Sequence, residues 1–121
     1  MNNISKYAIA LSAALMAACA TPVPAPTEQM AVSKAAVANA VSAGAPEFAA
    51  PDMNSAQDKL ARANLAMVAE DYESARWLAE HAQADADLAA AKARSAKAQK
   101  AVAAVQEDGR VLQEELNRKS K

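Results

Sequence analysis

Alanine recurs along residues 72–117 at a spacing that constrains the fold more than any other feature of the chain. Eight alanines from Ala75 to Ala103 follow at alternating intervals of four and three, and only Lys100 interrupts them. Alanine has the highest helix propensity, and an average period of 3.5 residues is that of helices packed as a coiled coil. Because no proline occurs here, we predict one helix from Tyr72 to about Asn117, about 70 Å long, with Gly109 as the place for a bend.

The rest of the composition also favours helix and argues against a sheet. The 121 residues include two glycines and only four aromatic residues, and valine, isoleucine and threonine do not form runs. Strands need β-branched and aromatic residues. The length allows one domain at most. A formal net charge of −1 argues against a strongly basic nucleic-acid binder, so we expect no nucleic-acid partner.

Two shorter helices precede the long one. The first runs to Gly44, and the segment Gly44 to Pro51 breaks it with two prolines. The expected fold is all-α, with short helices packed on one long C-terminal helix as a three-helix hairpin or coiled-coil-like bundle over residues 28–117. Polar side chains suited to cap helices are Thr27 for the first, Asp52 or Ser55 for the second, and Asp71 for the long one.

A second series with the same spacing runs along the long helix, about 200° away from the alanines. We expect the helix to offer these two faces to its two partners, with Trp77 in the core. Beyond about residue 95 the shorter helices cannot reach. The distal members of the series, Val102, Val105, Leu112 and Leu116, must then face another copy, another protein or water. They form a candidate interaction seam.

The N-terminal residues indicate export. Tyr7 to Ala18 is an apolar run that is too short to span a membrane, which takes about 20 residues, and it is typical of a secretory signal. The segment "LMAAC" that ends at Cys19 resembles a bacterial lipobox, with Met16 in the place usually held by leucine. The resemblance implies a signal peptide over residues 1–18 and lipidation of Cys19. The alternative is an ordinary signal cut near Ala18 or Ala20.

A tether follows over residues 19–27. Pro22, Pro24 and Pro26 alternate with other residues, which favours a stiff polyproline II segment of about 3.1 Å per residue. Ala20, rather than aspartate, follows Cys19. By resemblance to enterobacterial sorting, this implies the outer membrane, with the domain facing the periplasm and the acylated Cys19 in the bilayer.

A family resemblance covers residues 60–98, "LARANLAMVAEDYESARWLAEHAQADADLAAAKARSAKA". The stretch resembles alanine-rich bacterial lipoproteins built on a domain of unknown function, which is sometimes fused ahead of an OmpA-like peptidoglycan-binding module. The resemblance implies an envelope protein with a structural or protein-interaction role, as a homo-oligomer or with another envelope protein.

The C-terminus suggests a second role. Glu114 and Glu115 precede Arg118 and Lys119 by four residues, a favourable spacing for helical ion pairs. A basic tail, residues 118–121, ends at Lys121. This layout resembles the Braun-type lipoprotein, which is lipidated at one end and joined to peptidoglycan through its terminal lysine. The resemblance implies a possible cell-wall attachment at Lys121 and a membrane-to-peptidoglycan tether.

Candidate reactive residues are few. His81 is the only histidine, and no second histidine or free cysteine accompanies it to hold a metal. Asp85 and Asp87 are two residues apart and point to different faces of a helix. No nucleophile and base combination is available once Cys19 is acylated. We therefore expect no catalytic residue, no metal and no cofactor; a helical module that binds a peptide or a lipid remains a further alternative.

Overall fold

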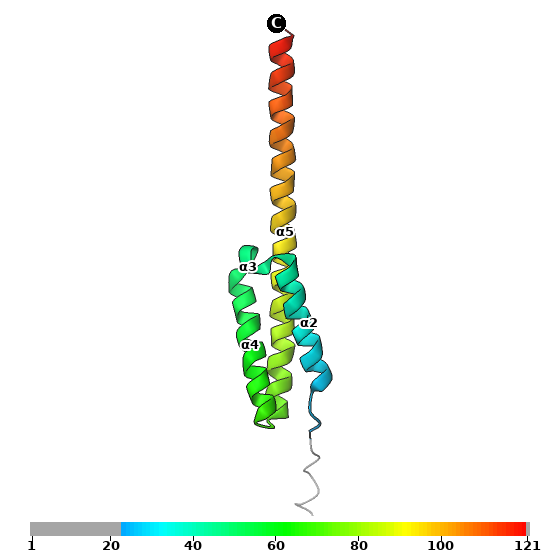
Figure 1. Cartoon of the computed structure of the whole chain (residues 1–121), viewed down its shortest axis with the longest axis vertical. Helices are drawn as coiled ribbons and strands as arrows, with labels where there is room; N and C mark the ends of the chain where they lie inside the picture. The colour runs from blue at the N-terminus through cyan, green and yellow to red at the C-terminus, as the bar shows by residue number, and fades with distance from the viewer. Residues whose placement is uncertain (1–22, 121) are drawn as a thin grey trace, which may run out of the picture.

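The computed structural model describes residues 23–120, and these residues form helices and their connections without a strand. Figure 1 shows the long helix as an axis, with the shorter helices along one half of it. The predicted signal peptide, Cys19 and Lys121 lie outside the described residues. The expected all-α fold is confirmed, and its helices are α2 (Thr27–Ala43), α3 (Ala45–Phe48), α4 (Ala50–Val68) and α5 (Tyr72–Lys119).

The first two helix starts differ from the expected caps. Pro26 is the N-cap of α2 and Ala49 that of α4, and neither makes a side-chain cap hydrogen bond. Thr27, Asp52 and Ser55 are therefore inside their helices, and their prediction as caps was wrong. Proline occupies the first turn of both α3 and α4, where its missing N–H costs nothing. Proline there sets where the helix begins.

Gly44 joins α2 to α3 in a conformation that favours glycine. Its φ is +92°, and its N–H donates to the carbonyls of Ala40 and Val41 at the end of α2. A Cβ at this position would lie 2.6 Å from Lys97 Nζ. The left-handed backbone is what favours glycine here, because the Lys97 side chain is flexible and could move aside for a Cβ.

The turn between α4 and α5 is closed by polar groups. Asp71 is the N-cap of α5, and its Oδ1 accepts a hydrogen bond of 3.1 Å from Ser74 N, which confirms the predicted cap. Hydrogen bonds from Ser74 hold the pKa of Asp71 below its ordinary value. Because only Ala69–Asp71 connect α4 to α5, this short turn lets the two helices run antiparallel.

The core is built almost entirely of alanine. All buried hydrophobic side chains among the described residues are alanines except Met30, Met53 and Leu78. On α5 they form one wedge, because both α2 and α4 pack on the same side of the long helix and also on each other. The buried residues of α5 are Ala75, Leu78, Ala79, Ala82, Ala86, Ala89, Ala90 and Ala93.

Small side chains let the helices approach closely. Ser33 of α2 is fully buried, and its Oγ lies 2.6 Å from the carbonyl oxygen of Ala79 on α5 and 2.8 Å from that of Gln29. A serine hydroxyl can reach the backbone of a neighbouring helix only where the two backbones are near each other. By donating to these carbonyl oxygens, the buried Ser33 hydroxyl avoids the free-energy cost of an unpaired polar group in the core.

One expectation about α5 was wrong. The second series does not face a partner helix, and Trp77, expected in the core, is 54% exposed. The physical reason is that alanine permits the closest approach, so both short helices pack against the alanine side. A helix in a three-helix arrangement needs one continuous buried stripe. The buried alanines of α5 form this stripe, so the bulky side chains of the second series can stay exposed.

Ion pairs join α4 to α5 along the rim of the core. Asp85 accepts hydrogen bonds from Lys59 and, at 2.7 Å, from Ser55 Oγ, and Lys92 Nζ lies 2.7 Å from Asp52 Oδ2. Partial burial acts to raise the pKa of Asp85, but the hydrogen bonds from Lys59 and Ser55 outweigh it and the pKa is lowered. The ionised form of Asp85 is thus favoured in the folded protein.

Enlarging an alanine of the wedge should destabilise the fold. Ala86 is fully buried, so Ala86→Leu should lower the free energy of unfolding by about 1–3 kcal/mol through overpacking. Urea denaturation followed by circular dichroism measures this. Ala103 is exposed on the same helix, so Ala103→Leu should change the value by less than about 0.5 kcal/mol. Equal losses in both variants would contradict the role of the wedge.

Acid should remove the contribution of Asp85. A carboxylate with a lowered pKa in the folded state stabilises above its unfolded pKa, and the effect is lost as the pH falls through the folded pKa. Asp85→Asn should therefore cost up to about 1 kcal/mol at pH 7, and the difference from the wild type should shrink as the pH falls below the ordinary carboxylate value of 3.8 and vanish below the lowered pKa of Asp85. Denaturation at a series of pH values gives the result; a pH-independent difference would count against it.

Candidate functional site: the exposed stripe of the long helix

An uncharged row of side chains runs along the open face of α5, and all of its members are exposed. Its large apolar side chains, which in most chains would be covered, are between 46% and 71% exposed. We call this row the outer stripe; it consists of Trp77, His81, Ala84, Leu88, Ala91, Ser95, Ala98, Val102, Val105, Gly109, Leu112 and Leu116.

The outer stripe keeps a coiled-coil rhythm through its whole length. Successive members are separated by four and three residues without a break from Trp77 to Leu116, which is the spacing of two apolar positions per heptad. Near its beginning, the rings of Trp77 and His81 are in contact, with centroids 4.2 Å apart and ring planes tilted by 46°. His81 is thus an exposed neighbour of Trp77.

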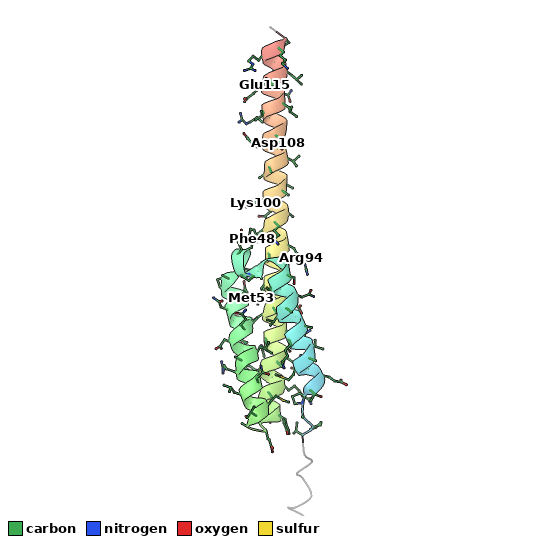
Figure 2. All side chains as sticks on the ribbon, viewed as in Figure 1. Phe48, Met53, Arg94, Lys100, Asp108 and Glu115 are labelled. Carbon is green, nitrogen blue, oxygen red and sulfur yellow. The ribbon has the colours of Figure 1, made fainter. Side chains whose placement is uncertain are left out.

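Beyond the bundle, α5 continues alone. Lys97 makes a last link to the shorter helices, with its Nζ 5.8 Å from the centre of the Phe48 ring. Residues 98–119, which we call the distal arm, then extend for about 33 Å at 1.5 Å per residue. In Figure 2, Lys100, Asp108 and Glu115 project from the arm with no other helix beside them, whereas Phe48 and Met53 lie on the bundle.

Gly109 does not interrupt the arm. α5 is one helix from Tyr72 to Lys119, two residues past the expected end, and Figure 1 shows no kink along it. A Cβ at Gly109 would meet nothing within 4 Å. No contact with the described residues therefore accounts for glycine at this position.

Ion pairs cover the opposite side of the arm. Arg110 donates to both oxygens of Glu107, at 3.0 and 2.6 Å, and also pairs with Glu114. These hydrogen bonds hold the pKa of Glu107 below its ordinary value and raise that of Arg110. Glu114 thus pairs with Arg110 instead of Arg118, which bonds to Glu115 at 2.7 Å. The network lies more than 100° from the outer stripe, so the arm is amphipathic.

A single helix such as the distal arm gains little stability from contacts within its own chain. Single helices of this length are marginal in water, since most helical stability in proteins comes from packing of an apolar face. Here the ion pairs are exposed, and exposed pairs contribute little. The apolar face of the arm therefore lacks a packing partner in the part of the chain that the structure describes.

The structure brings together four of the residues singled out in the sequence and leaves others apart. Val102, Val105, Leu112 and Leu116 lie along the arm on one face. Asp85 is paired with Lys59, whereas Asp87 is exposed. The interaction seam predicted from the sequence contained only residues of the arm. The structure adds the exposed residues Trp77 and Leu88 beside the bundle. Their place in the unbroken series of four- and three-residue intervals could have identified them from the sequence.

Other surface features are less suited to hold a ligand. One depression of about 340 Å³ is lined by Arg62, Glu73, Ser74, Trp77 and Leu78; it mixes charged and apolar groups, whereas ligand sites are mostly apolar clefts. Within residues 23–120, no cluster of three or more histidine, cysteine, aspartate or glutamate residues is placed to bind a metal. No helix in this part of the chain is both long and apolar enough to cross a membrane.

Replacing Gly109 should strengthen the arm. Alanine favours a helix by about 1 kcal/mol over glycine, so Gly109→Ala should raise the protection of arm amides about fivefold in hydrogen exchange. Gly44→Ala is the matched control with the opposite sign, because its backbone is left-handed. It should lower the stability of the whole bundle. Reduced protection in Gly109→Ala would show that the arm needs flexibility there.

Comparisons with known proteins agree with this fold. A crystal structure of a DUF4398 family protein from Pseudomonas aeruginosa PAO1 is similar, with 38% sequence identity and a TM-score of 0.73, covering 78% of this chain and 98% of that one. No curated protein matches the chain. The model of the domain of unknown function DUF4398 matches residues 28–105, well over half of the sequence. The chain therefore belongs to the DUF4398 family.

Proposed function

We propose that the protein is a lipid-anchored envelope protein that holds an interaction surface away from the outer membrane, facing the periplasm. The observation that carries this proposal is the distal arm, which leaves the bundle with Val102, Val105, Leu112 and Leu116 all more than half exposed. A stiff amphipathic helix with no partner among residues 23–120 suits a structural or protein-interaction role.

The anchor and the arm belong to opposite ends of the described structure. Val23, within the predicted tether, lines a depression with Glu70, Asp71, Tyr72 and Glu73, at the turn where α5 begins. The arm ends at Lys119, 48 residues along α5, or about 72 Å away at 1.5 Å per residue. Acylation of Cys19, as the lipobox-like segment implies, would therefore attach the end opposite the arm to the bilayer.

The proposed role includes no catalytic step. The chain has one histidine and one cysteine, and acylation of Cys19 would remove the nucleophile that a histidine could activate. His81 lies against Trp77 at an exposed position, with the two ring planes tilted by 46°. Binding, through apolar area and length, is the activity these residues support.

A tether between membrane and peptidoglycan is the second candidate. It is favoured by the position of Lys119, which ends a continuous helix at the end remote from the tether side, with Lys121 two residues further in the sequence. The ε-amine of Lys121 would supply the attachment. A peptide- or lipid-binding module has less support, because a second depression, lined in part by Glu28, Arg76 and Glu80, is also polar.

Intact mass of the native protein, isolated from envelopes after muramidase digestion, tests these roles. We expect a chain that starts at Cys19 and carries diacylglycerol and acyl groups. Cys19→Ser should move the protein from the membrane fraction to the soluble fraction with the helical content of residues 27–119 unchanged, because Cys19 lies outside the described helices. An added muropeptide at the C-terminal end would support the tether, and an unmodified Cys19 would overturn the anchor.

A further inference from the structure

We propose that the outer stripe is the pairing surface for a second copy of this chain, in a parallel two-stranded coiled coil along α5. The pairing deepens the proposed function, on which its membrane orientation rests, by naming the partner of the exposed face. Each copy would present the same stripe, and the two bundles would lie side by side at one end.

The outer stripe is suited to meet its own copy. In a parallel pair in register, each stripe residue meets the same residue of the second copy. None of the stripe residues from Ala84 to Leu116 is charged, so no like charges meet in the centre. The charged network of Glu107, Arg110 and Glu114 lies on the outer side of both helices, where it stays in water.

The stripe is also long enough. From Trp77 to Leu116 it extends about 59 Å at 1.5 Å per residue, and with a helix width of about 10 Å it covers about 600 Å² per copy. Two copies would then bury about 1,200 Å² in total, which reaches the lower limit for stable, specific protein interfaces. The distal arm alone would supply about half of this area, so the part of the stripe beside the bundle is needed.

The rows that flank the stripe favour the parallel orientation. In a parallel pair, each residue of one flanking row faces the residue five positions later in the second copy. Asp87 then faces Lys92 of the second copy, which also pairs with Asp52 of its own chain, and Asp108 faces Gln113. Glu80 faces Asp85, whose charge is already paired with Lys59. The flanking rows are Glu80, Asp87, Arg94, Ala101, Asp108 and Glu115 on one side, and Asp85, Lys92, Gln99, Gln106 and Gln113 on the other.

The antiparallel orientation would bring like charges together. With the stripes fully overlapped, the first flanking row faces itself. Glu80 would lie opposite Glu115 of the second copy, and Asp87 opposite Asp108, each contact occurring twice. Like charges opposed in this way are unfavourable. In the second flanking row Asp85 and Lys92 would face Gln106 and Gln99, which carry no charge, so this row offers no compensation. Parallel pairing also keeps both copies of Val23, four residues after Cys19, at one end, as anchoring of both chains in a single membrane requires.

Cysteine crosslinking of the full-length chain tests the pairing. Leu116→Cys lies on the stripe near the end of the arm, where only a parallel pair brings two copies of residue 116 together. Asn117→Cys is the matched control, because it lies at the same height but about 100° around the helix. We expect about tenfold more disulfide-linked dimer for Leu116→Cys, because the bond requires Cα atoms within about 7 Å.

The assay is run in membranes and again on the purified protein with Cys19→Ser. A failure of the proposed lipid anchor can then be distinguished from a failure of the proposed pairing. A dimer in both settings supports the pairing even if Cys19 proves unmodified. The triple variant Val105→Ser, Leu112→Ser, Leu116→Ser should abolish the dimer in sedimentation with the thermal midpoint of the bundle unchanged. Three results would overturn the proposed pairing. They are equal crosslinking of residues 116 and 117, a monomeric mass together with no crosslink in membranes, and a crosslink only to a different protein.

Discussion

The close packing of alanine against alanine on one side of α5 is the constraint on which the rest of the structure depends. Alanine removes little apolar area from water, and burial stabilises by only about 25 cal/mol per Å². What it offers instead is proximity, seen in the contact of Ser33 with the backbone of α5. The thin core is then secured at its rim by the pairs Lys59–Asp85 and Asp52–Lys92 and at its ends by Gly44 and Asp71.

That packing also decides which surface is left for function. Because α2 and α4 both occupy the alanine wedge, the opposite face of α5 stays open from the first turn to the last. In most small domains the bulky apolar residues fill the core. Here Trp77 and Leu88 are at the surface, in line with the apolar residues of the arm. A single uncharged face therefore spans both the bundle and the arm.

The length of α5 links the proposed anchor, the arm and the proposed pairing in one physical scheme. A helix does not shorten under side-chain rearrangement, so a chain anchored near the start of α5 would carry the arm to a fixed distance from the bilayer. Pairing along the outer stripe would stiffen that arm, which gains little from its own ion pairs. Membership of the DUF4398 family is compatible with such a role and assigns none.

The sequence by itself determined the helical class, the long helix and the cap at Asp71, because alanine content, breaker positions and capping side chains act locally. It also marked Val102, Val105, Leu112 and Leu116 as unpartnered, since the shorter helices are too short to reach them. Only the tertiary structure decided which face of α5 is buried. Both faces share one period, and the choice depends on how closely the helix backbones approach, which no local pattern specifies. For the same reason Trp77 changed from an expected core residue to an exposed one, and the caps Thr27, Asp52 and Ser55 gave way to helix starts set by proline and packing.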